Sequence, residues 1–232
     1  MLNNIVKRRM RLKPLTETEI DIIRSATKLF LQNGYTQTTF KMIEADSGVK
    51  VGAITYHFHS KEEMLQILIE ELMDYHAGLI DDMHDDMQSA LMAYAMEIAV
   101  QVALCENNRN AWDLYYSGYS LPLTYEHIKG WAAEKNYSLL GSRLPDWTES
   151  DFRDKEVIAS GIELAALKTF CDRGFTLDKK ISLCLDSMMM LYEIPKAERQ
   201  EVIQKILLRD YKKIAKDMFD KFVKRLDNDI VN

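Results

Sequence analysis

Residues 38–58, TTFKMIEADSGVKVGAITYHF, carry the pattern of two short helices joined by a tight turn. Thr38 or Thr39 can cap the first helix, because a threonine hydroxyl accepts a hydrogen bond from the free N–H groups at a helix start. Gly48 supplies the permissive backbone that a sharp turn between helices needs. The pattern predicts a helix-turn-helix near the start of the chain.

The second of these helices, predicted over about residues 50–57, has two different sides. Helical spacing turns Ile54 and Phe58 toward the interior. The other side carries small, polar and aromatic groups that are able to meet base edges and phosphates: Lys50, Val51, Ala53, Thr55, Tyr56 and His57. The pattern therefore predicts a helix that enters the major groove of DNA.

A longer set of positions, between about residues 17 and 65, follows one ordered pattern. It includes residues 23–30 (IRSATKLF), Asn33-Gly34-Tyr35, Thr38-Thr39, Ile43, Ser47-Gly48-Val49, Gly52-Ala53-Ile54, Tyr56-His57-Phe58 and Ser60-Lys61-Glu62. This segment resembles the TetR family of bacterial transcriptional regulators. The resemblance implies an all-α fold with a three-helix DNA-binding domain over residues 1–60. A larger helical domain for ligand binding and dimerisation is expected over residues 61–232.

The resemblance also implies which residues touch DNA. In similar proteins these are the first residues of the second and third helices, an aromatic-histidine pair and the lysine after a capping serine, here Thr39, Lys50, Gly52, Tyr56, His57 and Lys61. Lys50 replaces the capping Ser or Thr that the family often has. Thr55 stands where many members have Tyr, so which ring reaches the DNA backbone stays open. For His57 we favour a phosphate contact over a ring packed within the domain.

The charge of the chain is unevenly distributed. Residues 1–60 hold nine Lys/Arg and five Asp/Glu, a balance of +4, which leaves −10 for the rest of a chain whose net charge is −6. Only the N-terminal part has the electrostatic footprint of a phosphate binder. The first residues of the chain are basic, and the side chains concerned are Lys7, Arg8, Arg9, Arg11 and Lys13. They form either a solubilising tail or an arm that follows the DNA backbone or an adjacent minor groove.

Composition favours a helical protein inside the cell. The chain has 232 residues with only nine Gly and four Pro, and many Leu, Met, Glu, Lys and Ala. Cys105, Cys171 and Cys184 are widely spaced and form no CxxC, which fits a reduced cytosolic compartment. No apolar run is long enough for a membrane span and no signal-peptide core follows the basic start. We expect a cytoplasmic protein with no membrane partner.

Helix starts and stops divide the chain further. Capping boxes at Thr16-Glu17-Thr18-Glu19 and Ser60-Lys61-Glu62-Glu63 each open a helix. Apolar spacing then predicts helices at about 61–88, 89–107, 109–118, 122–141, 151–173, 178–193 and 196–227.

The middle of the chain is rich in aromatic residues. Four fall near one another on successive turns and are our candidates for lining an effector pocket: Trp112, Tyr115, Tyr116 and Tyr119. The competing interpretation is an ordinary helical core with tyrosine hydroxyls at its surface.

Two helices near the end predict a homodimer. Their apolar positions are broad enough to bury more than one neighbour, and a four-helix interface with a second copy, as in the TetR family, would use Leu185, Met188, Met189, Ile203, Leu207, Tyr211, Ile214, Met218 and Phe222. A dimer also suits the DNA function, since two short recognition helices read a palindrome with half-sites about 34–36 Å apart.

Metal binding and catalysis find little support. Asp81, His84 and Asp85 share one helical face, but a solvated acidic helix end is the favoured interpretation, so we assign no metal and no cofactor. The sequence has no Ser-His-Asp order, glycine-rich phosphate loop or HExxH, so no enzyme is expected.

Together these features predict a transcriptional repressor that binds double-stranded DNA. It would leave a palindromic operator when an unidentified small molecule binds the C-terminal domain. One alternative is a regulator of the same fold controlled by a partner protein. The alternative from another class is a helical metal-binding protein or enzyme.

Overall fold

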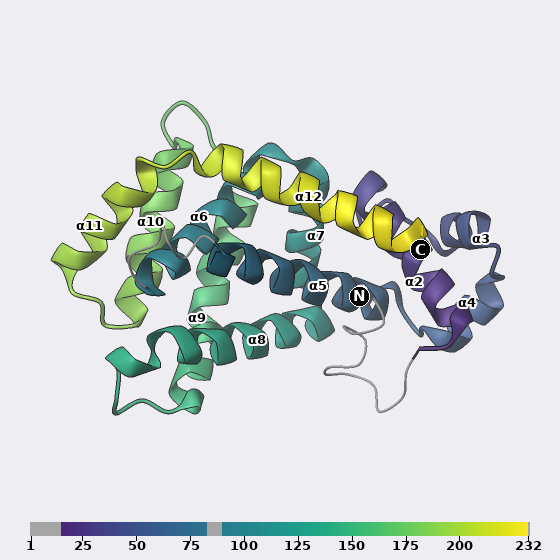
Figure 1. Cartoon of the computed structure of the whole chain (residues 1–232), viewed down its shortest axis with the longest axis horizontal. Helices are drawn as coiled ribbons and strands as arrows, with labels where there is room; N and C mark the ends of the chain where they lie inside the picture. The colour runs from purple at the N-terminus through teal and green to yellow at the C-terminus, as the bar shows by residue number, and fades with distance from the viewer. Residues whose placement is uncertain (1–14, 83–89, 232) are drawn as a thin grey trace.

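The computed structural model describes residues 15–82 and 90–231, and every regular element in these ranges is a helix. Figure 1 shows their arrangement: α2 (Glu17–Asn33), α3 (Phe40–Ser47), α4 (Val51–His57), α5 (Lys61–Asp82), α6 (Ala90–Asn107), α7 (Arg109–Ser120), α8 (Pro122–Leu140), the 3₁₀ helix η2 (Gly141–Arg143), α9 (Glu149–Lys168), α10 (Leu177–Leu191), α11 (Lys196–Leu207) and α12 (Tyr211–Val231). The predicted all-α fold with an N-terminal helix-turn-helix is confirmed. Within the described ranges no helix combines the length and apolar character that a membrane span requires.

The first three helices form at the predicted signals. The Thr16 hydroxyl accepts from the Glu19 N–H at 3.3 Å, and the Glu19 carboxylate accepts from the Thr16 N–H at 2.8 Å, so the capping box is complete. Thr39 is the residue that caps α3. Gly48 ends α3 in the left-handed region, with φ of 75°, which explains why glycine stands there. Local sequence therefore accounts for the start of α2 and for the start and end of α3.

The centre of the larger part is α6. It is apolar on all sides, and nearly every residue from Leu91 to Cys105 is buried. Such a helix needs neighbours on every side, and α5, α7, α8, α10, α11 and α12 supply them.

The predicted single helix over residues 196–227 is wrong, because two helices occupy this stretch. The chain leaves the helix at Leu208, and Asp210 begins a new one: its carboxylate accepts from the Lys213 N–H at 3.1 Å and its carbonyl from the Ile214 N–H at 3.0 Å. This break lets α12 turn back along α6 and α5 until it reaches α2 (Figure 1).

The turn at Asp210 also places the residues predicted for the dimer interface against the rest of the same chain. Six of the residues assigned to it are buried within one chain: Leu185, Met188, Met189, Tyr211, Met218 and Phe222. Ile203, Leu207 and Ile214 are partly buried and pack against the same core. Because α12 covers α5 and α6, these side chains fill the interior of the protein and have little surface to offer a second copy.

Two predictions fall outside the described part of the structure. The basic residues 7–13 precede it, and the side chains of Asp81, His84 and Asp85 are not described either. Among the described residues, no three His, Cys, Asp or Glu side chains come together as a metal site.

Candidate DNA-binding surface and effector cavity

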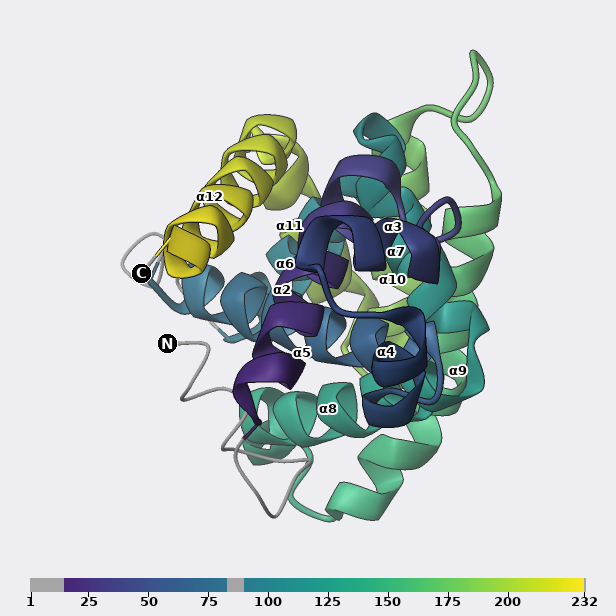
Figure 2. The same cartoon turned by 90° about the vertical axis from the view of Figure 1, so that its right-hand side faces the viewer.

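The helix α4 lies at one end of the molecule beside α3, as Figure 2 shows. Ile54 and Phe58 have no exposed surface, so the opposite side of α4 faces outward. On that side Tyr56 is 79% exposed, and Gly52 and Thr55 are also exposed. The helix presents the side chains that the sequence predicted for it, with Val51, Ala53 and His57 only partly exposed.

The start of α4 is capped from another helix. Lys50 makes no side-chain capping bond. Instead Glu44 of α3 accepts from the Val51 N–H at 3.1 Å and from the Lys50 ammonium at 2.8 Å. The Lys50 ammonium, through this hydrogen bond, lowers the pKa of Glu44. Glu44 thus supplies the cap that a Ser or Thr would give, and Lys50 stays exposed at the positive end of the helix.

His57 and Lys61 have partners within the protein. The His57 ring lies edge-on to Tyr56, and its Nδ1 is 3.5 Å from Glu19 Oε1. Lys61 donates to the carbonyls of Tyr35 and Thr38 at 2.9 and 2.6 Å, and burial lowers its pKa. These contacts tie α2 and the turn after it to neighbouring helices, a structural role beside any contact with DNA.

The helix α7 holds the turn between α2 and α3. Asp113 accepts from the Thr36 N–H at 2.8 Å and from its hydroxyl at 2.7 Å. A Cβ on Gly34 would lie 2.7 Å from the Asp113 carboxylate, so only glycine allows this approach. Asn110 donates to the carbonyls of Leu31 and Gln32, the last turn of α2. The α2 helix and the turn before α3 are therefore held to the larger part of the molecule by α7.

We expect Asp113→Ala to lower the free energy of unfolding by about 1–2 kcal/mol, because the two donors of Thr36 lose a charged acceptor. Urea denaturation would measure the change. Asp21→Ala is the control, since its ion pair with Arg24 is exposed and surface pairs contribute little. Equal, negligible effects of both changes would contradict the fastening role of Asp113.

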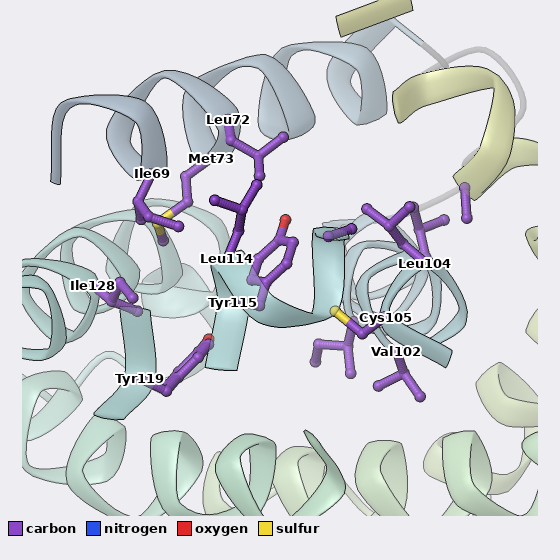
Figure 3. Packing of buried hydrophobic residues seen from close by; sticks show 14 of the residues in the cluster. Ile69, Leu72, Met73, Val102, Leu104, Cys105, Leu114, Tyr115, Tyr119 and Ile128 are labelled. Atoms are coloured by element: carbon purple, nitrogen blue, oxygen red, sulfur yellow. The ribbon is translucent and has the colours of Figure 1, made fainter. Parts of the chain in front are cut away.

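The predicted effector residues lie on α7 but do not all line one space. Tyr119 lines a cavity of about 40 Å³, and Trp112 lines a neighbouring cavity of about 10 Å³. Figure 3 shows Tyr115 and Tyr119 on α7 among residues of α5 and α6. Tyr115 is buried, and Tyr116 stacks on Trp112 with 5.0 Å between ring centroids. Of the four predicted residues, Tyr119 and Trp112 each line a different cavity, and Tyr115 and Tyr116 line neither of the two.

The larger cavity is lined by acidic side chains that the sequence interpretation missed. Glu156 and Glu163 stand seven residues apart on α9, on one face of that helix. Asn136 donates to Glu156 at 2.7 Å, Tyr192 also bonds Glu156, and Tyr119 donates to Glu163 at 2.5 Å. The sequence signal that could have identified them is the presence of glutamate at positions of α9 that helical spacing turns toward the interior, where acidic residues are rare.

Burial changes the protonation of these carboxyl groups. It raises the pKa of Glu163 to about 8, and the nearby Glu156 adds to this. Burial raises the pKa of Glu156 as well, against the effect of its hydrogen bonds. At neutral pH the Glu163 carboxyl is therefore mostly protonated.

Comparison with known proteins supports the N-terminal pattern. Residues 22–68 match the family described as bacterial regulatory proteins, tetR family. The HTH-type transcriptional regulator TtgR of Pseudomonas putida is 38% identical over 63 residues, which are 27% of this chain and 30% of TtgR. The chain thus spans less than a third of the length of this relative.

Solved structures resemble a much larger part of the chain. RolR in complex with resorcinol matches with a TM-score of 0.56 and 15% identity, over 81% of this chain and 93% of RolR. SmeT, the repressor of the Stenotrophomonas maltophilia multidrug efflux pump SmeDEF, matches with a TM-score of 0.50 and 17% identity, over 75% of this chain and 89% of SmeT. At these identities the likeness establishes the fold.

Proposed function

The chain belongs, through its N-terminal domain, to the TetR family of bacterial regulators, and we propose that it is a DNA-binding transcriptional repressor that releases a palindromic operator when a small ligand binds. The observation that carries this proposal is the outer face of α4, where Lys50 and Tyr56 are exposed at the end of the molecule. The positive charge balance of residues 1–60 supports it, because phosphate contacts supply much of the affinity for DNA.

The residues proposed to meet DNA do different work. Lys50 exchanges its bond to Glu44 for a phosphate or a guanine. Tyr56 and Thr39 contact the backbone. Gly52 and Ala53 are small enough to bring the helix close to the groove floor. His57 and Lys61 already have partners within the protein. To contact DNA, each must either exchange that partner for a phosphate or bind both at once.

The test is selection of binding sites from a randomised DNA duplex library, repeated with Lys50→Ala and Tyr56→Ala. We expect an enriched palindrome, and an affinity loss of about tenfold for each variant. Lys50→Ala should also reduce the dependence of affinity on salt, because one charge contact is removed. Lys196→Ala, an exposed lysine at the start of α11, should change neither quantity. Binding that is blind to sequence at two salt concentrations would contradict the proposal.

A homodimer requires an apolar surface, and α9 with α10 offers one. These helices pack side by side, and each exposes large apolar side chains: Val157 and Ile158 on α9, Leu183 and Met190 on α10, each at least half exposed. Gly161 lies on the same face of α9, and a Cβ there would meet no atom of its own chain within 4 Å. We propose that α9 and α10 of two copies form the four-helix interface.

Release of DNA requires that the ligand favour one arrangement of the two recognition helices over another. The helix α7 carries both Tyr119, which lines the cavity, and Asp113, which holds the turn before α3. The helix α5, which begins directly after α4, is the other connection. We propose that a shift of α5 and α7 couples the sites, with a coupling free energy of about 1–3 kcal/mol.

A further inference from the structure

The cavity between α6, α8, α9 and α10 is unusual in its charge. Its lining includes three carboxyl groups, Glu97, Glu156 and Glu163, and one ammonium group, Lys135. Lys135 forms an ion pair with Glu97. Among the described residues neither Glu156 nor Glu163 forms an ion pair, and the charge of Lys135 offsets only part of the rise in the pKa of Glu163. Ionisation of both carboxyl groups would therefore place two negative charges beside a cation that Glu97 already holds, in a cavity of about 40 Å³.

The hydrogen bonds around these two carboxyl groups do not supply that charge. Tyr119, Tyr192 and Asn136 donate to them, but all three are neutral. Hydrogen bonds from neutral groups stabilise a buried carboxylate less than a cation does.

The cavity also has a polar group with no partner in the described part of the chain. Tyr94 lines it and is 3% exposed, and its hydroxyl has no hydrogen-bond partner among residues 15–82 and 90–231. A buried hydroxyl without a partner is costly, and a ligand or water in the cavity would satisfy it. The rings of Tyr94, Tyr119 and Trp131 form aromatic walls, whose faces attract cations.

We propose that this cavity binds the ammonium group of a small organic amine, with Glu163 and Glu156 as its counter-charges. The ammonium group would donate to the two carboxylates and to the Tyr94 oxygen, and the carbon skeleton would lie against the aromatic walls. An anion would meet three carboxyl groups, and its one possible cation, Lys135, already has a carboxylate partner. This amine would be the small ligand of the proposed repressor. Amine binding itself is argued from the cavity alone, and only its effect on DNA binding rests on the proposed function.

The cavity sets a limit on the size of the amine. About 40 Å³ holds an ammonium group and little more. Met73 and Met188 also line it, and methionine side chains change shape readily. Glu163, Gln101 and Ile98 line the second cavity too, so a larger amine could extend past Glu163 toward Trp112.

Binding of an amine displaces a proton. The protonated amine meets the neutral Glu163 carboxyl, the carboxyl proton leaves to solvent, and an ammonium–carboxylate pair remains. Since burial raises the pKa of Glu163 to about 8, the apparent affinity should rise about tenfold per pH unit below that value and level off above it.

The groups that face Glu163 do not obscure this dependence. The carboxyl and ammonium groups among them are Glu156 on α9, whose pKa burial also raises, Lys135 on α8, paired with Glu97, and Lys180 on α10, paired with Glu106. The others are neutral at the pH of the test, because burial raises the pKa of Tyr94, Tyr115, Tyr119, Tyr192, Cys105 and Cys184.

The test is isothermal titration of the full-length protein, without DNA, with three kinds of probe. The amines are methylamine, propylamine and benzylamine, their neutral counterparts are methanol, propanol and benzyl alcohol, and the anion is benzoate. We expect at least one amine to bind at least about tenfold more tightly than its alcohol, and benzoate not to bind. Titration between pH 6 and 9, below the pKa of the free amine, should show the affinity rise and the release of one proton.

Glu163→Gln is the central variant. Glutamine has the shape of the protonated acid, so the fold should be kept, and the melting temperature checks this. The variant should lose the preference for amines and the pH dependence while alcohol binding stays within about twofold. Glu156→Gln should weaken amine binding but keep the pH dependence. Glu126→Gln, the same change at an exposed carboxylate, should have no effect.

Three outcomes separate this inference from the proposed function. If no amine binds more tightly than its alcohol, or if Glu163→Gln keeps the preference, the amine site is overturned, even if the protein binds its operator. If amines bind but operator affinity does not change, the site stands and ligand-controlled release fails. If amines bind and no duplex is selected, the site stands and the DNA-binding proposal fails.

Discussion

Replacing Ile158 and Leu183 together by lysine is expected to separate the proposed dimer into monomers and to weaken binding to the proposed operator by about 10²- to 10⁴-fold, the gain that linking two binding modules typically provides. Both side chains are more than half exposed on the apolar face of α9 and α10. Two lysines on each copy would place like charges opposite one another in an interface that must lose its water. Each chain alone keeps one recognition helix, which makes few base contacts.

The measurement pairs light scattering after size-exclusion chromatography with a binding titration on the selected operator. Leu208→Lys is the control, because Leu208 is 86% exposed but lies between α11 and α12 and belongs to neither α9 nor α10. The control should stay dimeric and bind normally. A double variant that remains dimeric, or a Leu208→Lys protein that dissociates, would place the interface elsewhere.

Phe222→Ala is expected to lower the free energy of unfolding by about 3–5 kcal/mol, the usual cost of removing a buried phenylalanine ring. The sequence pattern alone assigned Phe222 to the contact between two copies. In the structure it is fully buried on α12, with its ring centroid 5.3 Å from that of Tyr75 on α5. The loss should therefore appear as lower stability of each chain, with the monomer–dimer equilibrium of the folded protein unchanged.

Chemical denaturation at several protein concentrations separates the two effects, because the apparent stability of a dimer depends on concentration. Val223→Ala, at a partly buried neighbouring position, should cost about 1 kcal/mol and serves as the comparison. A Phe222→Ala protein that unfolds like the native chain at high concentration, yet dissociates on dilution, would restore Phe222 to the dimer interface.

The helix-turn-helix was predictable because each of its signals acts over a few residues. The Thr16 capping box, the Thr39 cap and the left-handed Gly48 each involve bonds to residues no more than four positions away. Ile54 and Phe58 are buried where the helical period placed them. The cap of α4 was not predicted, because it comes from a more distant residue. The Glu44 carboxylate accepts a hydrogen bond from the N–H of Val51, seven positions later in the chain.

The helices after α4 show that the apolar face of a helix does not reveal which other helix will pack against it. The sequence predicted apolar faces on the helices that became α10, α11 and α12, and those faces are indeed buried or partly buried. Hydrophobic burial has no direction, so the stripe fits a second copy as well as the same chain. The break at Asp210 sends α12 back over α5 and α6. The apolar side chains on α9 and α10 that are at least half exposed are Val157, Ile158, Leu183 and Met190.

The sequence by itself determined the helical class, the position of the helix-turn-helix and the match of residues 22–68 to the tetR family, since these depend on local hydrogen bonds and helical spacing. Only the tertiary structure decided which helices cover one another, where an apolar face stays open and which carboxyl groups meet in a cavity. Glu97, Glu156 and Glu163 come from two helices far apart in the sequence. The charge balance of that cavity exists only after several helices have packed around it, because burial is a property of all the neighbours together.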